Sequence, residues 1–537
     1  MTRSLLSARF VALTAAAAAV AAILTAAPAV AGRSQEIDWR PCPEDPAVSC
    51  GTLTLPVDWS SPAGATFDLA VSRRPASDPA RRVGALLVNP GGPGGSGIDF
   101  AFAAGSVFSA ELLQRFDIIG VDPRGVARSH PVVCSAEALG RPGDTPLPRS
   151  QTDYDRLVAS NRQLVADCRS HTGPLYDHVD SVSVARDLDA VRAVLGEETL
   201  NWYGVSYGTL MGQMYAELFP GRIRAMVHDG NMDHSLGTSA FQLSEASFVE
   251  DSYAEFVAWC HRSMSCAVHG QDVRAVYADL LAEADAGRLV DPADGHRVSP
   301  WELLDITQFF FGRPRWVELG DLIESLATGV ASAGADSARA TFTAHRSPKL
   351  HQTATTATKS GTAGKAQLVE DVRPQFCQDW SLPIRDFAEL DRLWTASNRV
   401  APSMRTSVLA WVSNMQCIGW PGRVNNPQHR LDVEDAPTIL MLNGRHDPAT
   451  GYAWALHVAA QLRDQAVLVT CEGAGHTAYR RNACTPGRGR RVSARADGAD
   501  RGHRVRGQRP GLGPHRRPTR GGLARHLMTR ALLRAIT

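Results

Sequence analysis

Short apolar runs alternate with segments of helical spacing along the first half of the chain. The runs at 85–88, 116–121 and 225–228 are bounded by Gly, Pro or polar residues and predict buried strands. Helical spacing predicts helices at 150–168 and 181–196. Strands that alternate with helices predict an α/β fold with a mostly parallel sheet flanked by helices. Two earlier runs, broken by Pro and Gly, predict an antiparallel edge of that sheet at 51–57 and 66–73.

The alternation stops in the middle of the chain and resumes near its end. Helical spacing dominates from about 232, for example at 246–260 and 273–286, and a polar stretch at 345–366 predicts a mobile loop or insertion. Strand-like runs return at 438–442 and 466–470. The predicted parts are a first core segment at 32–231, an inserted, mainly helical lid domain at 232–430 and a second core segment at 431–484.

The N-terminus has the pattern of an export signal. Arg3 and Arg9 precede an apolar, alanine-rich stretch at 10–27, and Ala-Val-Ala at 29–31 fits a small-x-small cleavage site. We predict a Sec-type signal peptide at 1–31 and a secreted protein. A retained membrane anchor is the competing interpretation, but the apolar run is short and ends in a cleavage motif.

Composition narrows the function classes only slightly. Hydrophobic residues make up 44% of the chain and charged residues 21%, which is ordinary for a globular protein. The net charge of +1 gives no basis for a nucleic-acid partner or for stable membrane association. We expect a monomer.

Ten cysteines in an exported chain predict disulfides. Spacing suggests four pairs and leaves Cys471 and Cys484 over, although sequence alone does not fix the connectivity. The suggested pairs are Cys42–Cys50, Cys134–Cys168, Cys260–Cys266 and Cys377–Cys417. A metal site is the competing interpretation, but the chain has no C-x-x-C pair and no matching His spacing. We therefore expect neither a metal nor another cofactor.

A Gly-x-Ser-x-Gly pattern at 204–208 is the centre of the candidate chemistry. An apolar run ends at Tyr203, and helical spacing begins at Thr209. A strand that turns sharply into a helix strains the turning residue, and glycines on both sides avoid collisions there. We predict that Ser206 projects as a nucleophile and that the amide of Tyr207, at the helix N-terminus, donates to a developing oxyanion. For this motif alone, a glycine-containing turn with a surface serine is the alternative.

A glycine-rich loop follows the strand at 85–88. Its sequence, Asn-Pro-Gly-Gly-Pro-Gly-Gly-Ser-Gly at 89–97, lets the backbone approach a ligand with its amides exposed. It lacks the Lys-Ser/Thr of a P-loop and the spacing of a dinucleotide fingerprint, which argues against nucleotide binding. We predict that Gly91 or Gly92 donates the second N–H of an oxyanion hole, with a flexible loop as the alternative.

Two later loops carry the partners that a serine nucleophile needs. Asp447 follows the strand at 438–442, and His476 follows the strand at 466–470. Loops after strands form the edge at which α/β sheets carry their chemistry, and the order Ser…Asp…His is that of α/β-hydrolases. In a predicted triad with Ser206, His476 would take the serine proton and Asp447 would orient and stabilise the ring. Weaker alternatives nearby are His446, Asp229 and His228.

Five motifs of the chain form a set: the loop at 89–97, Asp-Pro-Arg-Gly-Val-x-Arg-Ser at 122–129, Gly-x-Ser-Tyr-Gly-Thr at 204–209, Cys-x-Gly-Trp-Pro at 417–421 and Gly-Ala-Gly-His-Thr-Ala-Tyr at 473–479. Together they resemble the secreted tripeptidyl aminopeptidases of actinomycetes, which are α/β-hydrolase serine peptidases related to prolyl aminopeptidases. The resemblance covers about residues 35–484. It implies an α/β-hydrolase fold and release of short peptides from free N-termini, with the lid limiting access.

The resemblance also implies a site for the terminal amine of the substrate. An ammonium group needs an acidic partner in a partly dry pocket, and the candidates by position are Asp379, Glu370 and Asp371. Ala127 stands where the related pattern has Gly. In the same loop, we expect Asp122 and Arg124 to form a charge-assisted bond with a structural role.

Residues 485–537 depart from the resemblance. They are rich in Arg and Gly and contain no aromatic residue, whereas the family ends in a short helix and a final Cys. We interpret them as translation out of frame from near codon 485. A disordered basic tail that binds cell-wall polyanions is the alternative.

We therefore expect a secreted serine exopeptidase that releases short peptides, tripeptides by resemblance, from free N-termini through an acyl-enzyme. A secreted esterase or lipase is the first alternative, because a triad does not encode the leaving atom of the acyl group. A non-catalytic, cell-surface-binding protein of the same fold is the second. The expected partners are peptides with a free N-terminus.

Overall fold

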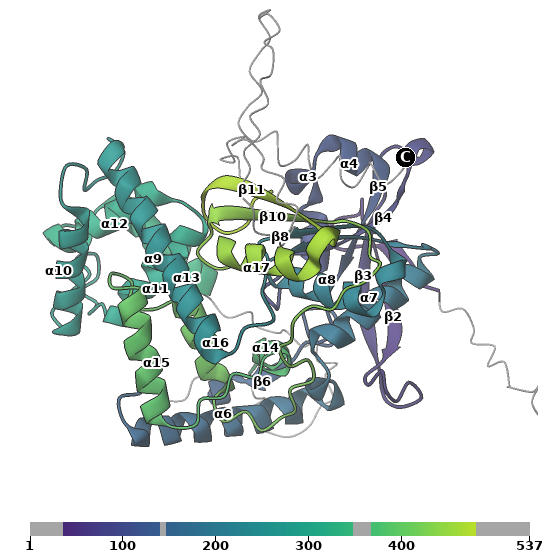
Figure 1. Cartoon of the computed structure of the whole chain (residues 1–537), viewed down its shortest axis with the longest axis horizontal. Helices are drawn as coiled ribbons and strands as arrows, with labels where there is room; N and C mark the ends of the chain where they lie inside the picture. The colour runs from purple at the N-terminus through teal and green to yellow at the C-terminus, as the bar shows by residue number, and fades with distance from the viewer. Residues whose placement is uncertain (1–35, 140–146, 347–366, 480–537) are drawn as a thin grey trace, which may run out of the picture. The chain divides into compact units, whose positions relative to one another are not determined.

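The computed structural model describes residues 36–139, 147–346 and 367–479. Within them, nine strands form one sheet in the order β1-β2-β3-β5-β4-β7-β8-β10-β11 (Figure 1). The strands are β1 Arg40–Pro41, β2 Ser49–Pro56, β3 Thr66–Arg74, β4 Gly84–Asn89, β5 Phe116–Val121, β7 Leu200–Val205, β8 Ile223–Asp229, β10 Ile439–His446 and β11 Ala466–Ala474. Pairs from β1 to β5 are antiparallel and all later pairs are parallel. The predicted mostly parallel sheet with an antiparallel edge is confirmed.

Helices cover both faces of this sheet, so β4, β5 and β7 are buried along their whole length. One buried cluster joins β7 to α7 Ser181–Val194, α8 Tyr207–Leu218 and α17 Tyr452–Leu462. The cluster on the other face contains residues of α2 Gly97–Phe102, α3 Ala104–Val107 and α4 Ala110–Arg115. In Figure 1, α7, α8 and α17 lie below the sheet, and α3 and α4 lie above it.

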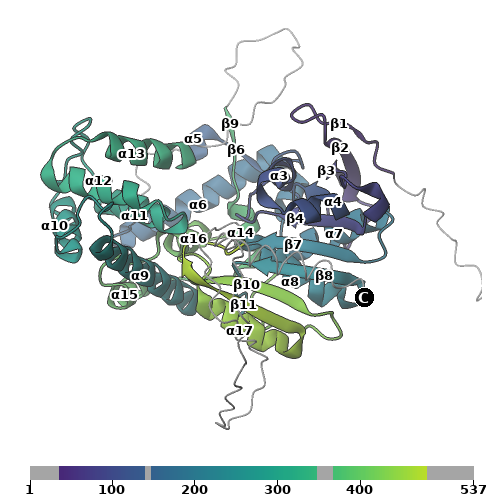
Figure 2. The same cartoon turned by 90° about the horizontal axis from the view of Figure 1, so that it is seen from above.

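A second group of helices has a hydrophobic core of its own. Buried residues between Ala246 and Val408 form one cluster, which includes Phe256, Phe310 and Leu322. The helices of this region are α9 Thr238–Arg262, α10 Val273–Asp285, α11 Pro300–Gly312, α12 Trp316–Thr328, α13 Ala333–Arg346, α14 Arg373–Asp379, α15 Phe387–Val400 and α16 Val408–Cys417. Figure 2 shows α10 to α13 together, with α9 beside them.

The segment around α14 packs differently from the rest of this region. Phe376, Cys377 and Trp380 belong to the buried cluster of the sheet rather than to that of the other helices. Just before α14, strand β9 Leu368–Glu370 pairs antiparallel with β6 Val133–Ser135. The sequence pattern did not predict this ribbon. The remaining elements are α5 Ala136–Leu139, α6 Gln151–Thr172 and the short 3-10 turns Pro79–Arg81, Pro174–Asp177, Pro220–Arg222 and Arg463–Gln465.

Many of these helices begin where a short polar side chain can cap them. Ser150, Asp180 and Asp386 each accept a hydrogen bond from a backbone N–H in the first turn of α6, α7 and α15. Such caps satisfy N–H groups that have no partner inside the helix. This explains why the helices predicted at 150–168 and 181–196 begin within a residue of their predicted starts.

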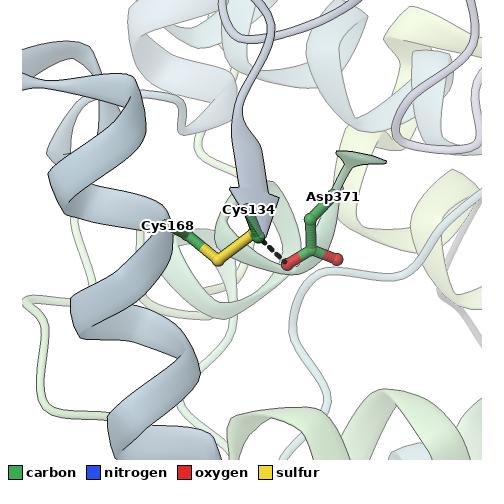
Figure 3. A group of neighbouring side chains, drawn as sticks. All are labelled: Cys134, Cys168 and Asp371. Carbon is green, nitrogen blue, oxygen red and sulfur yellow. Dashed lines mark hydrogen bonds between the residues drawn. A yellow bond between two sulfur atoms is a disulfide. The ribbon is translucent and has the colours of Figure 1, made fainter. Parts of the chain in front are cut away.

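The four suggested disulfides are all present: Cys42–Cys50, Cys134–Cys168, Cys260–Cys266 and Cys377–Cys417. Cys471, which spacing left over, is also disulfide-bonded. Figure 3 shows Asp371 beside Cys134, with its Oδ2 3.8 Å from the sulfur. Because the sulfurs of Cys134 and Cys168 are joined to each other, this group offers no pair of thiolates to a metal.

The loop after β5 is braced as predicted, but by other partners. Arg124 is fully buried and forms two hydrogen bonds with Asp187 on α7, at 2.6 and 2.7 Å. Asp122 instead accepts from Ser96 Oγ at 2.5 Å and lies 3.3 Å from Arg128. The expected bond between Asp122 and Arg124 is therefore wrong, because each side chain has a tertiary partner on another element.

Backbone geometry explains why the related pattern has Gly where this chain has Ala127. Its φ is 45°, in the left-handed region that favours glycine.

The predicted signal peptide at 1–31, the tail at 485–537 and the polar stretch at 347–366 lie outside the described residues. In the part of the chain that the structure describes, no helix has the length and apolar character needed to cross a membrane.

Candidate active site

Ser206 lies between β7 and α8 and has φ 54° and ψ −121°. A positive φ is rare for a residue with a side chain and persists only where the surroundings enforce it. A Cβ at Gly204 would lie 2.3 Å from the carbonyl oxygen of Gly208, and one at Gly208 would lie 2.8 Å from Oδ1 of Asn89. Both positions therefore need glycine. The helix begins at Tyr207, two residues before its predicted start.

Asp447 and His476 lie in the loops that follow β10 and β11. Nδ1 of His476 is 3.0 and 3.1 Å from the two carboxylate oxygens of Asp447. The carboxylate also accepts the amides of Ala449, Thr450 and Thr477, each at 2.9 Å.

Asp447 is charged despite being buried. Burial opposes its ionisation, but the neighbouring His476 ring and the amides of Thr450 and Thr477 outweigh burial, so the pKa of Asp447 lies below its ordinary value. An ionised Asp447 favours a proton on Nδ1 of His476. This leaves Nε2 as the nitrogen able to accept a proton.

The end of β8 contacts both the backbone of Ser206 and the imidazole ring of His476. The amide of Ser206 donates to the carbonyl oxygen of Asp229 at 2.8 Å. A Cβ on the next residue, Gly230, would lie 3.4 Å from Cε1 of His476 and 2.9 Å from Oγ1 of Thr450. The end of β8 is thus packed between the turn at Ser206 and the ring of His476.

Two residues that support this pair were not assigned these roles from the sequence. Thr450 Oγ1 donates to Asp447 at 3.1 Å and lies 3.3 Å from Nδ1 of His476. Asp229 accepts the amides of Ala478 and Tyr479 at 2.6 and 2.9 Å, so it anchors the segment after His476. Thr450 stands three residues after Asp447, a spacing at which loop Asp residues bind the backbone. That local signal could have identified it.

The two weaker histidine candidates lie in other surroundings. His228 is fully buried, and burial lowers its pKa to about 3, so it stays neutral in the core. His446 precedes Asp447, and its Nδ1 is 2.7 Å from Asp251 on α9. The hydrogen bond to Asp251 raises the pKa of His446 against the opposing effect of burial.

Helix α9 packs against the loop that carries Asp447. Besides the bond between Asp251 and His446, the Phe248 ring would lie 2.3 Å from a Cβ placed on Gly451. Glu245, one turn earlier, is buried and accepts from Ser407 Oγ at 3.1 Å. Burial raises its pKa well above the ordinary value, and the charge of Asp447 acts in the same direction.

The glycine-rich loop lies directly against the turn at Ser206. A Cβ at Gly91 would be 2.3 Å from Val205 O, 2.9 Å from Tyr207 N and 3.0 Å from the Cβ of Ser206. The amide of Gly91 already donates to Asn89 Oδ1 at 2.8 Å. In the described part of the chain, no acceptor takes the amide of Gly92, whose residue is exposed. Of the two predicted oxyanion donors, the hydrogen-bonding pattern favours the amide of Gly92 over that of Gly91.

The three acids suggested for amine binding lie in different surroundings. Asp379 is fully buried beside Tyr207, whose hydroxyl donates to it. Asp371 lies beside the Cys134–Cys168 disulfide (Figure 3). One of its carboxylate oxygens is 3.3 Å from Nε of Arg373. Glu370 ends the short strand β9 and is partly exposed.

Comparison with known proteins agrees with this architecture. A family model described as "alpha/beta hydrolase fold" matches residues 84–295, and one described as "TAP-like protein" matches residues 406–488. Tripeptidyl aminopeptidase of Streptomyces coelicolor is 30% identical over 471 residues, which cover 85% of this chain and 82% of that protein. Serine protease Hip1 of Mycobacterium tuberculosis is 30% identical over 464 residues, covering 82% of this chain and 85% of Hip1. Carboxylesterase B of M. tuberculosis is 30% identical over 455 residues, covering 80% of each chain.

The parallel sheet, the strained serine between strand and helix and the family match define an α/β-hydrolase. The chain belongs to the tripeptidyl aminopeptidase family of α/β-hydrolase serine peptidases. It is accordingly a serine hydrolase of the peptidase class.

Proposed function

We propose that the protein is a secreted serine exopeptidase that releases short peptides, tripeptides in particular, from free N-termini. The observation that carries the proposal is the pairing of His476 with a buried, ionised Asp447, on the sheet edge at which Ser206 adopts the strained turn. The 30% identity to a tripeptidyl aminopeptidase over 85% of the chain supports the substrate class.

In the proposed reaction, Ser206 Oγ attacks the carbonyl carbon of the scissile peptide bond. Nε2 of His476 takes the hydroxyl proton, and the negative charge moves to the carbonyl oxygen. The tetrahedral intermediate collapses as His476 returns that proton to the leaving amine, which departs as the shortened polypeptide. Water then attacks the acyl-enzyme by the same route and releases the short peptide. Asp447 remains ionised throughout and stabilises the imidazolium.

The amides of Tyr207 and Gly92 are the proposed donors to the oxyanion. Tyr207 is the first residue of α8, where the helix dipole favours negative charge. Gly91 brings the loop within contact of the serine turn, and Gly92 carries the amide that has no other acceptor in the described chain. Removing one such donor typically lowers kcat by about 100- to 1,000-fold.

An exopeptidase of this kind also needs a partner for the substrate ammonium group, and the substrate must reach that partner from solvent. Of the three acids suggested by position, Asp379 is fully buried and the side chain of Asp371 is only 10% exposed. Glu370 is partly exposed, and it is therefore the proposed amine site. Glu370→Gln is expected to raise KM for free peptides and to leave turnover of N-blocked peptides unchanged.

The proposed organisation follows from the sequence pattern. We propose a signal peptide at 1–31, core segments at 32–231 and 431–484, and a lid domain at 232–430, which the separate buried cluster between Ala246 and Val408 supports. For 485–537, we propose a frameshift near codon 485. An uninterrupted reading frame in independent isolates would contradict it, and a mature N-terminus other than Gly32 would contradict the cleavage site.

A secreted esterase is the second candidate function, because Carboxylesterase B is also 30% identical over 80% of the chain. A substrate panel separates the two: Ala-Pro-Ala p-nitroanilide with a free N-terminus, the same anilide with a blocked N-terminus, and short-chain p-nitrophenyl esters. We expect the free peptide to have the highest kcat/KM. Equal turnover of free and blocked peptides would contradict the aminopeptidase proposal, and selective turnover of esters would favour the esterase.

A further inference from the structure

Asp379 is a buried carboxylate that accepts hydrogen bonds from three separate parts of the chain. It is the last residue of α14 and has no exposed surface. Its Oδ1 accepts the amide of Ser181 at 2.8 Å and Nδ2 of Asn426 at 2.9 Å. Its Oδ2 accepts Oγ of Ser181 at 2.6 Å and the hydroxyl of Tyr207 at 2.7 Å.

The bond to Tyr207 links this carboxylate to the serine turn. Tyr207 directly follows Ser206 and is the first residue of α8, so its backbone amide and its hydroxyl lie at opposite ends of the same residue. The ring is buried and packs against Phe376 of α14, with ring centroids 6.2 Å apart. Asp379 and Phe376 together fix the hydroxyl end of Tyr207, and thereby constrain its amide end.

The surroundings of Asp379 raise its pKa, so the charge on the group that accepts the Tyr207 hydroxyl depends on pH. Burial and the neighbouring Asp180 raise the pKa of Asp379 to about 7. The other titratable groups that face it are Tyr207, whose pKa burial raises well above its ordinary value, and His234, whose Nε2 lies 2.6 Å from the Asp379 carbonyl oxygen. Burial lowers the pKa of His234 to about 4, so His234 is neutral near pH 7. No cation is among the groups that donate to the Asp379 side chain in the described chain.

We propose that Asp379 is a positioning residue that holds Tyr207 so that its amide faces the oxyanion of the reaction. This inference rests on the proposed serine-hydrolase mechanism, and it gives Asp379 a role other than amine binding. The segment around α14 lies outside the first core segment in sequence, yet it packs on the sheet cluster and reaches the serine turn. A lid-side segment would thus contribute directly to catalytic geometry.

The test is a double-mutant cycle in the full chain with Asp379→Asn and Tyr207→Phe. Asn is close in shape to Asp, and its NH₂ group can donate to the hydroxyls of Ser181 and Tyr207, so Asp379→Asn is expected to fold. Each single variant should lower kcat about tenfold and leave KM within about twofold, because a charge-assisted bond that acts on the transition state is lost. The double variant should be no worse than either single one.

Either of two results in this cycle would overturn the proposal. The first is multiplication of the two losses to about 100-fold, since independent residues act additively in free energy. The second is an unchanged kcat in Tyr207→Phe, a variant that keeps the backbone amide and is informative even if Asp379→Asn does not fold. Ser181→Ala is the matched control, because it removes a donor to the same carboxylate without touching Tyr207. It should keep kcat within about twofold, and a loss equal to that of Asp379→Asn would indicate a merely structural network.

A second readout separates this inference from the proposed function. The rate at which a fluorophosphonate probe labels Ser206 depends on the oxyanion hole but not on the natural substrate. It should fall about tenfold in Asp379→Asn, as kcat does. If the parent itself does not cleave peptides and labelling still falls in Asp379→Asn, the positioning role stands and the peptidase proposal fails. If peptides are cleaved and labelling of Asp379→Asn matches that of the parent, the positioning role fails alone. The parent should also lose labelling rate as pH falls through about 7, and Asp379→Asn should lack that component.

Discussion

Gly91→Ala tests the steric argument for the glycine-rich loop. A Cβ at this position would lie 2.3 Å from the carbonyl oxygen of Val205, whereas ordinary C···O contacts are about 3.3 Å or longer. The backbone would have to separate by about 1 Å, and the other nearest atoms, Tyr207 N and Ser206 Cβ, belong to the same turn. The φ of 85° adds strain for any residue with a side chain.

The expected consequence is a loss of kcat by about 100-fold, because a displacement of roughly 1 Å in catalytic geometry can cost that much. The assay is steady-state hydrolysis of Ala-Pro-Ala p-nitroanilide, with fluorophosphonate labelling of Ser206 as a substrate-independent readout. Thermal unfolding followed by circular dichroism reports whether the variant is folded.

Gly105→Ala is the control, because Gly105 lies in helix α3 and a Cβ placed on it would have no atom within 4 Å. Alanine there should leave kcat unchanged and slightly favour the helix. A folded Gly91→Ala enzyme with the kcat of the parent would refute the close approach of this loop to the serine turn.

Three further outcomes follow from the geometry of the site. Asp447→Asn keeps the shape of the side chain but removes the charge that orients His476, so kcat should fall about 10⁴-fold with little change in melting temperature; a loss below tenfold would contradict its role. Gly94→Ala would place a Cβ 2.1 Å from Cγ1 of Val372, so activity should fall and should recover in the double variant with Val372→Ala; no recovery would show that another contact is responsible. The bond to Asp251 raises the pKa of His446, so its contribution to stability is present below about pH 6.5 and is lost as pH rises through the raised pKa. Melting temperatures from pH 6 to 9 should show this loss in the parent and not in Asp251→Asn, and identical profiles would contradict it.

The serine turn and the order of the triad candidates could be predicted because their signals are local. The glycines at 204 and 208 are required by contacts within a few residues of Ser206 and by one neighbouring loop. Asp447 and His476 follow apolar runs that are recognisable as strands without any knowledge of their partners. The parallel sheet could be predicted for the same reason, because buried parallel strands are nearly continuous apolar runs.

Features that depend on tertiary pairing were not predictable in this way. The β6–β9 ribbon joins two three-residue segments more than two hundred positions apart, and neither segment carries a strong pattern. Arg124 binds Asp187 rather than Asp122, because the choice among nearby acids is made by the packing of α7 on the sheet. The burial of Asp379 beside Tyr207 is likewise set by the return of α14 to the sheet.

The most direct measurement identifies the residue that an active-site probe labels and asks whether the labelling depends on His476. The full chain is treated with a fluorophosphonate probe, digested and analysed by mass spectrometry. We expect one adduct, on Ser206, that forms in the parent and is lost in both Ser206→Ala and His476→Ala. An adduct on another residue, or labelling of Ser206 at the parental rate in folded His476→Ala, would contradict activation of Ser206 by His476.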